Sequence, residues 1–233
     1  MKIVFFGTPE FASSQLEAII NSGYEVVAVV TAPDKPAGRG KKIQSSDVKI
    51  TALRYNIPIL QPVSLKSLDF IEELASYNAD LFVVVAFRML PESVWSMPRL
   101  GTFNLHASLL PQYRGAAPIN HAIINGEKET GLTTFLLDKE IDTGEIMLQR
   151  HIDIEDTDNA GTLHDKLMIQ GNEVVVQTIK MIESGEIKTF KQELIIERDN
   201  VSLKSAPKIF KEDCRIDWSK DAVSVINFIR GLS

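Results

Sequence analysis

A run of six apolar residues, 81–86, constrains the fold of this chain most strongly. A strand without polar side chains on either face is typical of the centre of a parallel sheet. Other short runs rich in β-formers occupy residues 2–6, 25–31, 58–60, 102–106, 131–137, 145–151 and 191–196. Apolar residues at helical spacing occupy 9–22, 68–76, a segment starting near Pro118, 160–184 and 222–230. The alternation predicts an α/β fold: an open, mostly parallel, twisted sheet with helices on both faces, in a Rossmann-like arrangement.

Length and pattern together suggest where this fold ends along the chain. The 233 residues are 44% hydrophobic and 24% charged, which is enough to bury one full core and part of another. The strand and helix pattern weakens after Gly185, and residues 199–211 are polar. We therefore predict a catalytic domain over residues 1–204. Residues 205–233 are predicted to form a linker and the beginning of a C-terminal domain.

The same sequence suggests a cytoplasmic protein. Residues 1–6 contain one lysine and lead directly to Gly7, without the longer apolar region of a signal peptide. A single cysteine, Cys214, cannot form an internal disulfide and fits a reducing compartment. Because no apolar run is long enough to span a bilayer, we expect no membrane association.

Three polar residues at predicted strand ends form the best candidate for a catalytic site. Asn104 and His106 stand two residues apart, so a strand over 102–106 places both side chains on one face. Asp142 follows a later strand, in the turn Asp-Thr-Gly that ends at Gly144. In open α/β sheets the loops at the carboxyl ends of strands converge on one crevice. Asn104, His106 and Asp142 could there stabilise an oxyanion and move a proton, although each alone is more often a structural residue.

A basic loop over residues 34–42 stands out from a chain whose net charge is −6. The overall charge argues against a general nucleic-acid coat, which would need concentrated cations. The loop, in contrast, contains four cations beside Pro36, Gly38 and Gly40, and it has no apolar face. These cations are Lys35, Arg39, Lys41 and Lys42. The pattern predicts a local contact with phosphate groups, and solvated lysines are the alternative.

Other common sites are not supported by the sequence. Gly7 lacks the second and third glycines of a dinucleotide-binding fingerprint, which argues against NAD. The segment 38–42 lacks the hydroxyl residue of a P-loop. Of the four histidines, His121, His151 and His164 have no Cys, His or Glu at metal-binding spacing, so we expect no metal.

These residues also carry a family resemblance. The run 104–118, Asn-Leu-His-Ala-Ser-Leu-Leu-Pro-Gln-Tyr-Arg-Gly-Ala-Ala-Pro, followed by Asp-Thr-Gly at 142–144, resembles the signature of the formyltetrahydrofolate-dependent formyltransferases and hydrolases. Within that group, residues 7–11, 33–42 and 61–62 are similar to methionyl-tRNA formyltransferases. The similarity covers essentially the whole chain. Segment 86–91 is one residue shorter than the corresponding family pattern, and the chain stops short of the family's C-terminal β-barrel.

The resemblance implies transfer of a formyl group from 10-formyltetrahydrofolate, without a metal, to the methionine amine of initiator Met-tRNA. It implies that Asn104, His106 and Asp142 are catalytic and that the basic loop approaches the tRNA. The expected folate contacts are Ser108, Leu109, Leu110, Pro111, Phe87, Arg88, Met89, Leu90, Leu137 and Asp138. We expect a monomer. Three alternatives remain: a formyltransferase acting on a small amine such as an amino sugar or ribonucleotide, a formyltetrahydrofolate hydrolase, and a catalytically silent RNA-binding module.

Overall fold

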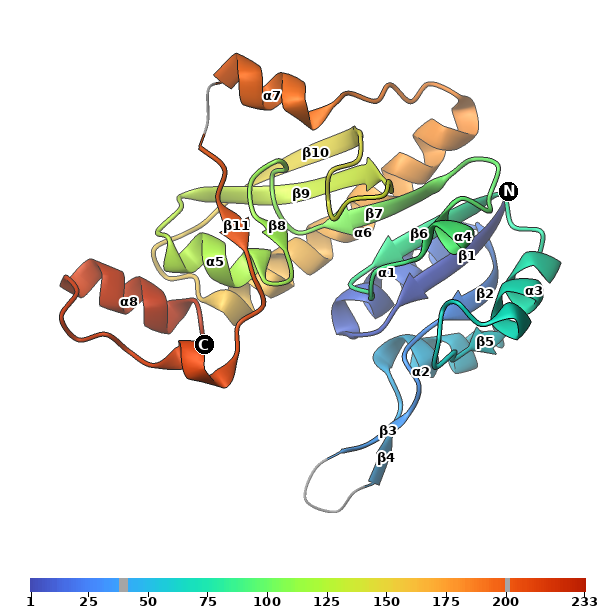
Figure 1. The fold of residues 1–233 in the computed structure, drawn as a ribbon, viewed down its shortest axis with the longest axis horizontal. Coiled ribbons are helices and arrows are strands. Elements are labelled where there is room, and N and C mark those ends of the chain that lie inside the picture. The colour runs from blue at the N-terminus through green and yellow to red at the C-terminus, as the bar shows by residue number, and fades with distance from the viewer. Residues whose placement is uncertain (38–41, 200–201) are drawn as a thin grey trace. The chain divides into compact units, whose positions relative to one another are not determined.

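The computed structural model describes residues 1–37, 42–199 and 202–233 (Figure 1). Seven strands make up its main sheet, and five of them are parallel, which confirms the predicted α/β class. The chain divides into two compact units. Unit 1 comprises Met1–Leu105 and Val175–Ile187, and unit 2 comprises His106–Val174 and Lys188–Ser233. The predicted domain boundary between residues 204 and 205 stays a prediction.

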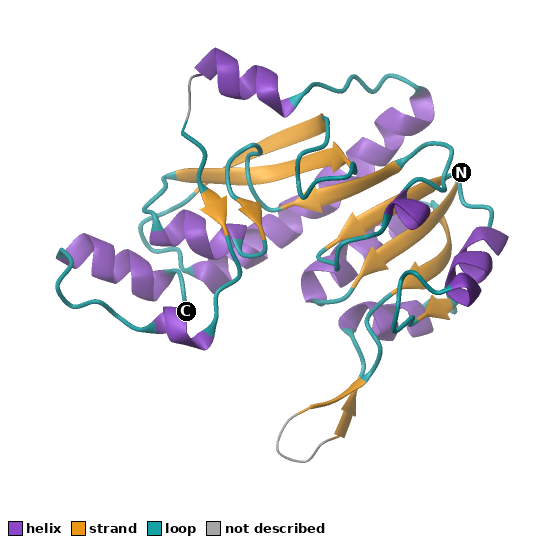
Figure 2. Cartoon of the chain, viewed as in Figure 1, coloured by secondary structure: helices purple, strands orange, loops and turns teal. Residues whose placement is uncertain are grey.

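The sheet of unit 1 contains the parallel strands in the order β7-β6-β1-β2-β5 (Figure 2). Their bounds are β1 Lys2–Gly7, β2 Glu25–Val30, β5 Ile59–Leu60, β6 Leu81–Val85 and β7 Thr102–His106. All five residues of β6 are buried, as expected for a central strand. β7 runs parallel to β6, from Thr102 beside Phe82 to Leu105 beside Val85. This pairing fixes the direction of the strand that ends at His106, the first residue of unit 2.

The helices that lie wholly within unit 1 are short. They are α1 Glu10–Asn21, α2 Asp47–Arg54, α3 Leu68–Ser76 and α4 Glu92–Trp95. α1 buries Phe11, Leu16 and Ile19 and packs against β1, β2 and β6. Two short antiparallel strands, β3 Lys35–Ala37 and β4 Lys42–Gln44, flank the centre of the basic loop. Residues 38–41 at that centre lie outside the described residues.

Unit 2 is built around an antiparallel pair, β9 Glu129–Leu136 and β10 Ile146–Asp153. Its other elements are β8 Arg114–Gly115, α5 Pro118–Ile124, α6 Ala160–Ser184, α7 Gln192–Asp199, β11 Ser205–Ala206, a 3₁₀ turn at Lys211–Cys214 and α8 Ala222–Arg230. The carboxyl-terminal part of α6, from Val175, belongs to unit 1. Leu110, Phe135 and Ile146 form a buried cluster in unit 2, and Ile195 of α7 packs against it. This cluster anchors the loop before β8, the ends of the hairpin strands and α7 to one another.

Most predicted elements agree with the structure, and one is wrong. The bounds predicted for β7, α3, α6 and α8 are confirmed, whereas α1 begins one residue later than predicted because Pro9 is its N-cap. Residues 191–196 were expected to form a strand, but α7 starts there at Gln192. Just before α7, an isolated antiparallel bridge pairs Phe190 with Ile146. No helix in the described part of the chain is long and apolar enough to cross a membrane.

Candidate active site

His106 is held in a defined orientation at the carboxyl end of β7. Its side chain is 8% exposed, and its Nε2 lies 2.9 Å from the carbonyl oxygen of Tyr113. A carbonyl can only accept a hydrogen bond, so Nε2 carries a hydrogen and donates it. The other ring nitrogen, Nδ1, lies 3.9 Å from Oδ2 of Asp142. The hydrogen bond to Tyr113 therefore occupies Nε2, and Nδ1 faces the carboxylate of Asp142.

The carboxylate of Asp142 is held by the conformation of its turn and by a hydrogen bond from a backbone N–H. Its φ of 56° lies in the left-handed region, which non-glycine residues adopt in tight turns. Oδ2, the oxygen that faces His106, accepts a hydrogen bond of 2.9 Å from the backbone N–H of Gly115. Only 12% of the Asp142 side chain is exposed. The structure thus brings together His106 and Asp142, which the sequence predicted as partners from 36 residues apart.

Asn104 lies on β7 two residues before His106, so both side chains share one face of the strand. Its Oδ1 is buried, and no hydrogen-bond partner for it exists among the described residues. A buried amide oxygen without a partner is costly, which makes such an atom a marker for a missing ligand. The oxygen and nitrogen of a carboxamide are assigned from their surroundings, so the unpaired atom could equally be the NH₂ group. Asn104 therefore fits the predicted contact with a polar group of a substrate.

The segment 108–111, predicted to contact folate, is packed into unit 2. Ser108 is fully buried and donates a hydrogen bond of 2.7 Å to the carbonyl of Gln112. Thr133 of β9 bridges the segment: its hydroxyl donates to the carbonyl of Ser108 (2.6 Å) and accepts from the N–H of Leu110 (3.1 Å). Pro111 is buried, and Leu109 is half-buried. The hydroxyl of Ser108 and the side chain of Leu110 are engaged within the protein, so they support the loop.

Residues 87–90, also predicted to contact folate, belong to unit 1. The Phe87 ring stands edge-on to the ring of Phe6. The Arg88 guanidinium lies over the Phe87 ring and donates hydrogen bonds to the carbonyls of Pro62 and Val63. Met89 is 70% exposed, whereas Leu90 is buried. An exposed methionine side chain is suited to contact an apolar ring system, because it is unbranched and polarisable.

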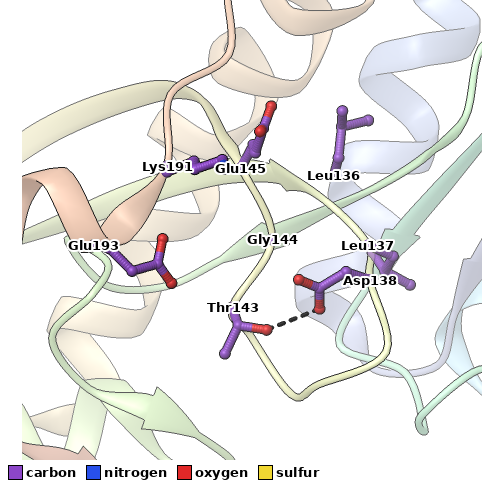
Figure 3. Close-up of a pocket in the computed structure, with 8 residues that line it drawn as sticks. All are labelled: Leu136, Leu137, Asp138, Thr143, Gly144, Glu145, Lys191 and Glu193. Carbon is purple, nitrogen blue, oxygen red and sulfur yellow. Dashed lines mark hydrogen bonds between the residues drawn. The ribbon is translucent and has the colours of Figure 1, made fainter.

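Leu137 and Asp138 line a pocket of about 380 Å³ in unit 2 (Figure 3). The other lining residues are Leu136, Thr143, Gly144, Glu145, Lys191 and Glu193. Oδ1 of Asp138 accepts hydrogen bonds from the Thr143 hydroxyl (2.8 Å) and from the N–H of Glu140 (3.0 Å). Asp138 thereby closes the turn that carries Asp142.

The base of the basic loop is held by polar side chains of unit 1. Lys49 donates to Oδ2 of Asp34 at 2.5 Å and to Oε1 of Gln61 at 2.9 Å. Gln61 in turn donates to Oδ1 of Asp34 at 2.9 Å. Both hydrogen bonds lower the pKa of the Asp34 carboxyl, and the one from Lys49 has the larger effect. Lys35 is exposed, Lys42 lies in β4, and Arg39 and Lys41 fall outside the described residues.

Comparison with known proteins settles which family has this arrangement. The sequence pattern of the formyl transferase family matches residues 1–179. The chain belongs to the formyl transferase family. It is 58% identical to a methionyl-tRNA formyltransferase of Bacteroides fragilis and 56% identical to one of Flavobacterium johnsoniae. Both alignments cover the whole chain and 71–72% of the relative.

Solved structures of formyl transferases share the fold. A sugar 3N-formyl transferase determined with dTDP and 5-N-formyl-THF is 25% identical, with a TM-score of 0.71 over 99% of this chain and 78% of that one. An N-formyltransferase from Helicobacter canadensis, in complex with folinic acid and dTDP-3-aminofucose, is 23% identical, with a TM-score of 0.73. It covers 99% of this chain and 80% of that chain. Within residues 1–37, 42–199 and 202–233, no group of three or more His, Cys, Asp or Glu could hold a metal ion.

Sequence reasoning missed the residues that support this formyl transferase site from outside the signature. Gln192 is fully buried and bonds to the backbone of the Asp142 turn. Thr133 bridges the 108–111 segment. The pattern of residues 191–196 favours a strand and gives Gln192 no special position, and Thr133 lies inside an ordinary strand pattern. A buried glutamine is an unusual feature, but burial is not visible in the sequence.

Proposed function

We propose that this protein transfers the formyl group of 10-formyltetrahydrofolate to the amino group of methionine on initiator Met-tRNA. The observation that carries the proposal is the proximity of the His106 and Asp142 side chains, whose Nδ1 and Oδ2 atoms lie 3.9 Å apart. The chain is also 58% identical to a methionyl-tRNA formyltransferase. The product would be formylmethionyl-tRNA for translation initiation.

In the proposed reaction, the methionine nitrogen attacks the formyl carbon, and the carbonyl oxygen becomes negatively charged. Hydrogen-bond donors placed where this charge develops can each contribute about 3 kcal/mol to catalysis. The Asn104 amide is one such donor. His106 can be the other only through Nδ1, because its Nε2–H is already donated to Tyr113.

Proton movement completes the exchange. A new C–N bond forms to methionine, the bond from carbon to N10 of the folate breaks, and the amine proton passes to N10. Nδ1 of His106 carries a proton in the form that donates to the oxyanion, and the Asp142 carboxylate 3.9 Å away stabilises the positive charge. His106 and Asp142 together relay the proton, directly or through water. No metal is required for these steps.

The folate contacts are proposed to come from residues 87–90, from the backbone of 108–111, and from Leu137 and Asp138. Oδ1 of Asn104, which is buried and has no partner within the part of the chain that the structure describes, supports a polar ligand beside β7. The cations Lys35, Arg39, Lys41 and Lys42 are proposed to approach the phosphates of the tRNA. We also propose that the protein acts as a monomer in the cytoplasm, without membrane attachment.

The test is to incubate the full-length protein with 10-formyltetrahydrofolate and methionine-charged initiator tRNA. We expect formylmethionine on the RNA and release of tetrahydrofolate in equal amounts. Release of tetrahydrofolate without any acceptor would indicate a hydrolase. Formylation of a dTDP-amino sugar or an aminoribonucleotide, but not of Met-tRNA, would contradict the proposed acceptor. Binding of tRNA without any turnover would indicate an RNA-binding module.

A further inference from the structure

Gln192 makes four hydrogen bonds that join α7 to the Asp142 turn and to β8. Its Nε2 donates to the carbonyl of Asp142 and to the carbonyl of Gly144, each at 2.9 Å. Its Oε1 accepts from Nε of Arg114 at 3.1 Å and from a terminal nitrogen of the same guanidinium at 2.7 Å. The side chain is fully buried.

The identity of the side chain follows from these partners. Two carbonyls require two donors, and a guanidinium offers donors only, so the carboxamide can be oriented in one way. A carboxamide has two N–H groups and two acceptor sites, and here all of them are used. Glutamate has no hydrogen to donate when ionised, and asparagine is one methylene shorter. Glutamine is therefore the only standard side chain of this length that satisfies both sides.

The two groups held by Gln192 are those that set the position of the Asp142 carboxylate. On one side it bonds to the backbone of Asp142 itself, whose left-handed φ needs support from its surroundings. On the other side it holds Arg114, and the N–H of the following residue, Gly115, donates to Oδ2 of Asp142. The same Oδ2 lies 3.9 Å from Nδ1 of His106. Gln192 is thus connected to the His106–Asp142 pair through two separate routes.

We propose that Gln192 is a positioning residue for formyl transfer, which sets the distance and direction of the Asp142 carboxylate relative to His106. This proposal rests on the proposed function. It assigns a role to α7, which lies beyond residues 1–179 that match the family pattern. Gln192 does not itself touch the reacting atoms in this scheme. It acts through Asp142.

The experiment uses the full-length protein and two substitutions, Gln192→Met and Gln192→Glu. Gln192→Met keeps the length and removes all four hydrogen bonds, whereas Gln192→Glu keeps the acceptor for Arg114 and removes both donors. We expect each to lower kcat by roughly 10- to 100-fold, because small displacements of catalytic groups have effects of this size. KM for both substrates should stay within about twofold, since Gln192 is not proposed to bind either of them. Glu197→Gln, at an exposed position of the same helix, is the matched control and should retain the parent kcat.

A double-mutant cycle separates positioning from a general structural role. If Gln192 acts through Asp142, adding Gln192→Met to Asp142→Asn should lower kcat by no more than about twofold further. If the two substitutions instead lower kcat independently, so that the fold-losses multiply in the double variant, the proposal is overturned. A parent-like kcat in both Gln192 variants would overturn it as well. Loss of folding in both variants, seen by circular dichroism, would also overturn it, because Gln192 would then serve the stability of the whole chain. Failure of the parent protein to formylate Met-tRNA would instead refute the proposed function.

Discussion

Replacing Gly144 with alanine would test how closely the Asp142 turn is packed. A Cβ at this position would lie 1.6 Å from the carbonyl oxygen of Leu136 and 3.2 Å from Cδ2 of Phe135. Real Cβ atoms essentially never approach another atom within 3.0 Å, so the two backbones must separate by about 1.4 Å. The two atoms nearest to this Cβ, the carbonyl oxygen and carbonyl carbon of Leu136, belong to the backbone, which cannot rotate away as a flexible side chain could.

The size of the effect follows from what this displacement breaks. Gly144 accepts a buried hydrogen bond from Gln192, and the adjacent Leu136 N–H donates to the carbonyl of Glu145 at 3.0 Å. Leaving a buried polar group without its partner costs about 1–3 kcal/mol. We therefore expect Gly144→Ala to lower the free energy of unfolding by about 2–4 kcal/mol, or the unfolding temperature by about 5–10 °C. Because Asp142 lies two residues away, kcat should fall by about 100-fold.

Thermal unfolding and steady-state formylation of Met-tRNA measure these two quantities. Gly161→Ala is the matched control, because the nearest atom to its Cβ would be the Asn159 side-chain oxygen at 3.3 Å, and Gly161 lies in the first turn of α6. This control should keep kcat and unfold at the same or a slightly higher temperature. A Gly144→Ala protein with a parent-like unfolding temperature and kcat would refute the reasoning, since the turn would then adapt without cost.

Three further substitutions test individual roles in the proposed reaction. His106→Ala should lower kcat by roughly 100-fold or more with folate binding largely retained; a near-normal kcat in the folded variant would remove His106 from the mechanism. Asp142→Asn keeps the shape but not the charge, so both kcat and its pH dependence should change; if neither does, Asp142 is a structural turn residue. Arg39→Ala should raise KM for Met-tRNA and weaken the salt dependence of tRNA binding, with folate binding unaltered; equal tRNA parameters at two salt concentrations would instead favour a small acceptor.

The repeating pattern of the sequence was sufficient to predict most of the fold. The apolar run 81–86 predicted a central strand, and β6 is completely buried. Helical spacing predicted α6 over 25 residues with its bounds. These segments could be predicted because each buries one face or both. A buried face requires apolar residues at regular intervals along the sequence, and this spacing can be recognised.

The α7 segment shows where such local signals fail. Leu194, Ile195 and Ile196 in succession favour a strand by their intrinsic preference. In the structure Ile195 packs against the cluster of Leu110, Phe135 and Ile146 while Gln192 bonds to the Asp142 turn. The helix allows Ile195 to reach the apolar cluster and Gln192 to reach the Asp142 turn. These tertiary contacts therefore override the local preference for a strand.

The candidate site divides in the same way between sequence and tertiary structure. The sequence alone determined that Asn104 and His106 share a strand face, because the two-residue period of a strand is a local property. Only the tertiary structure decided which nitrogen of His106 is committed to Tyr113, and which backbone groups hold Asp142. Gln192 lies 50 residues after Asp142, and its four hydrogen bonds have no periodic trace in the sequence. Contacts of this kind arise when distant segments fold together, since hydrogen bonding depends on distance and direction in space.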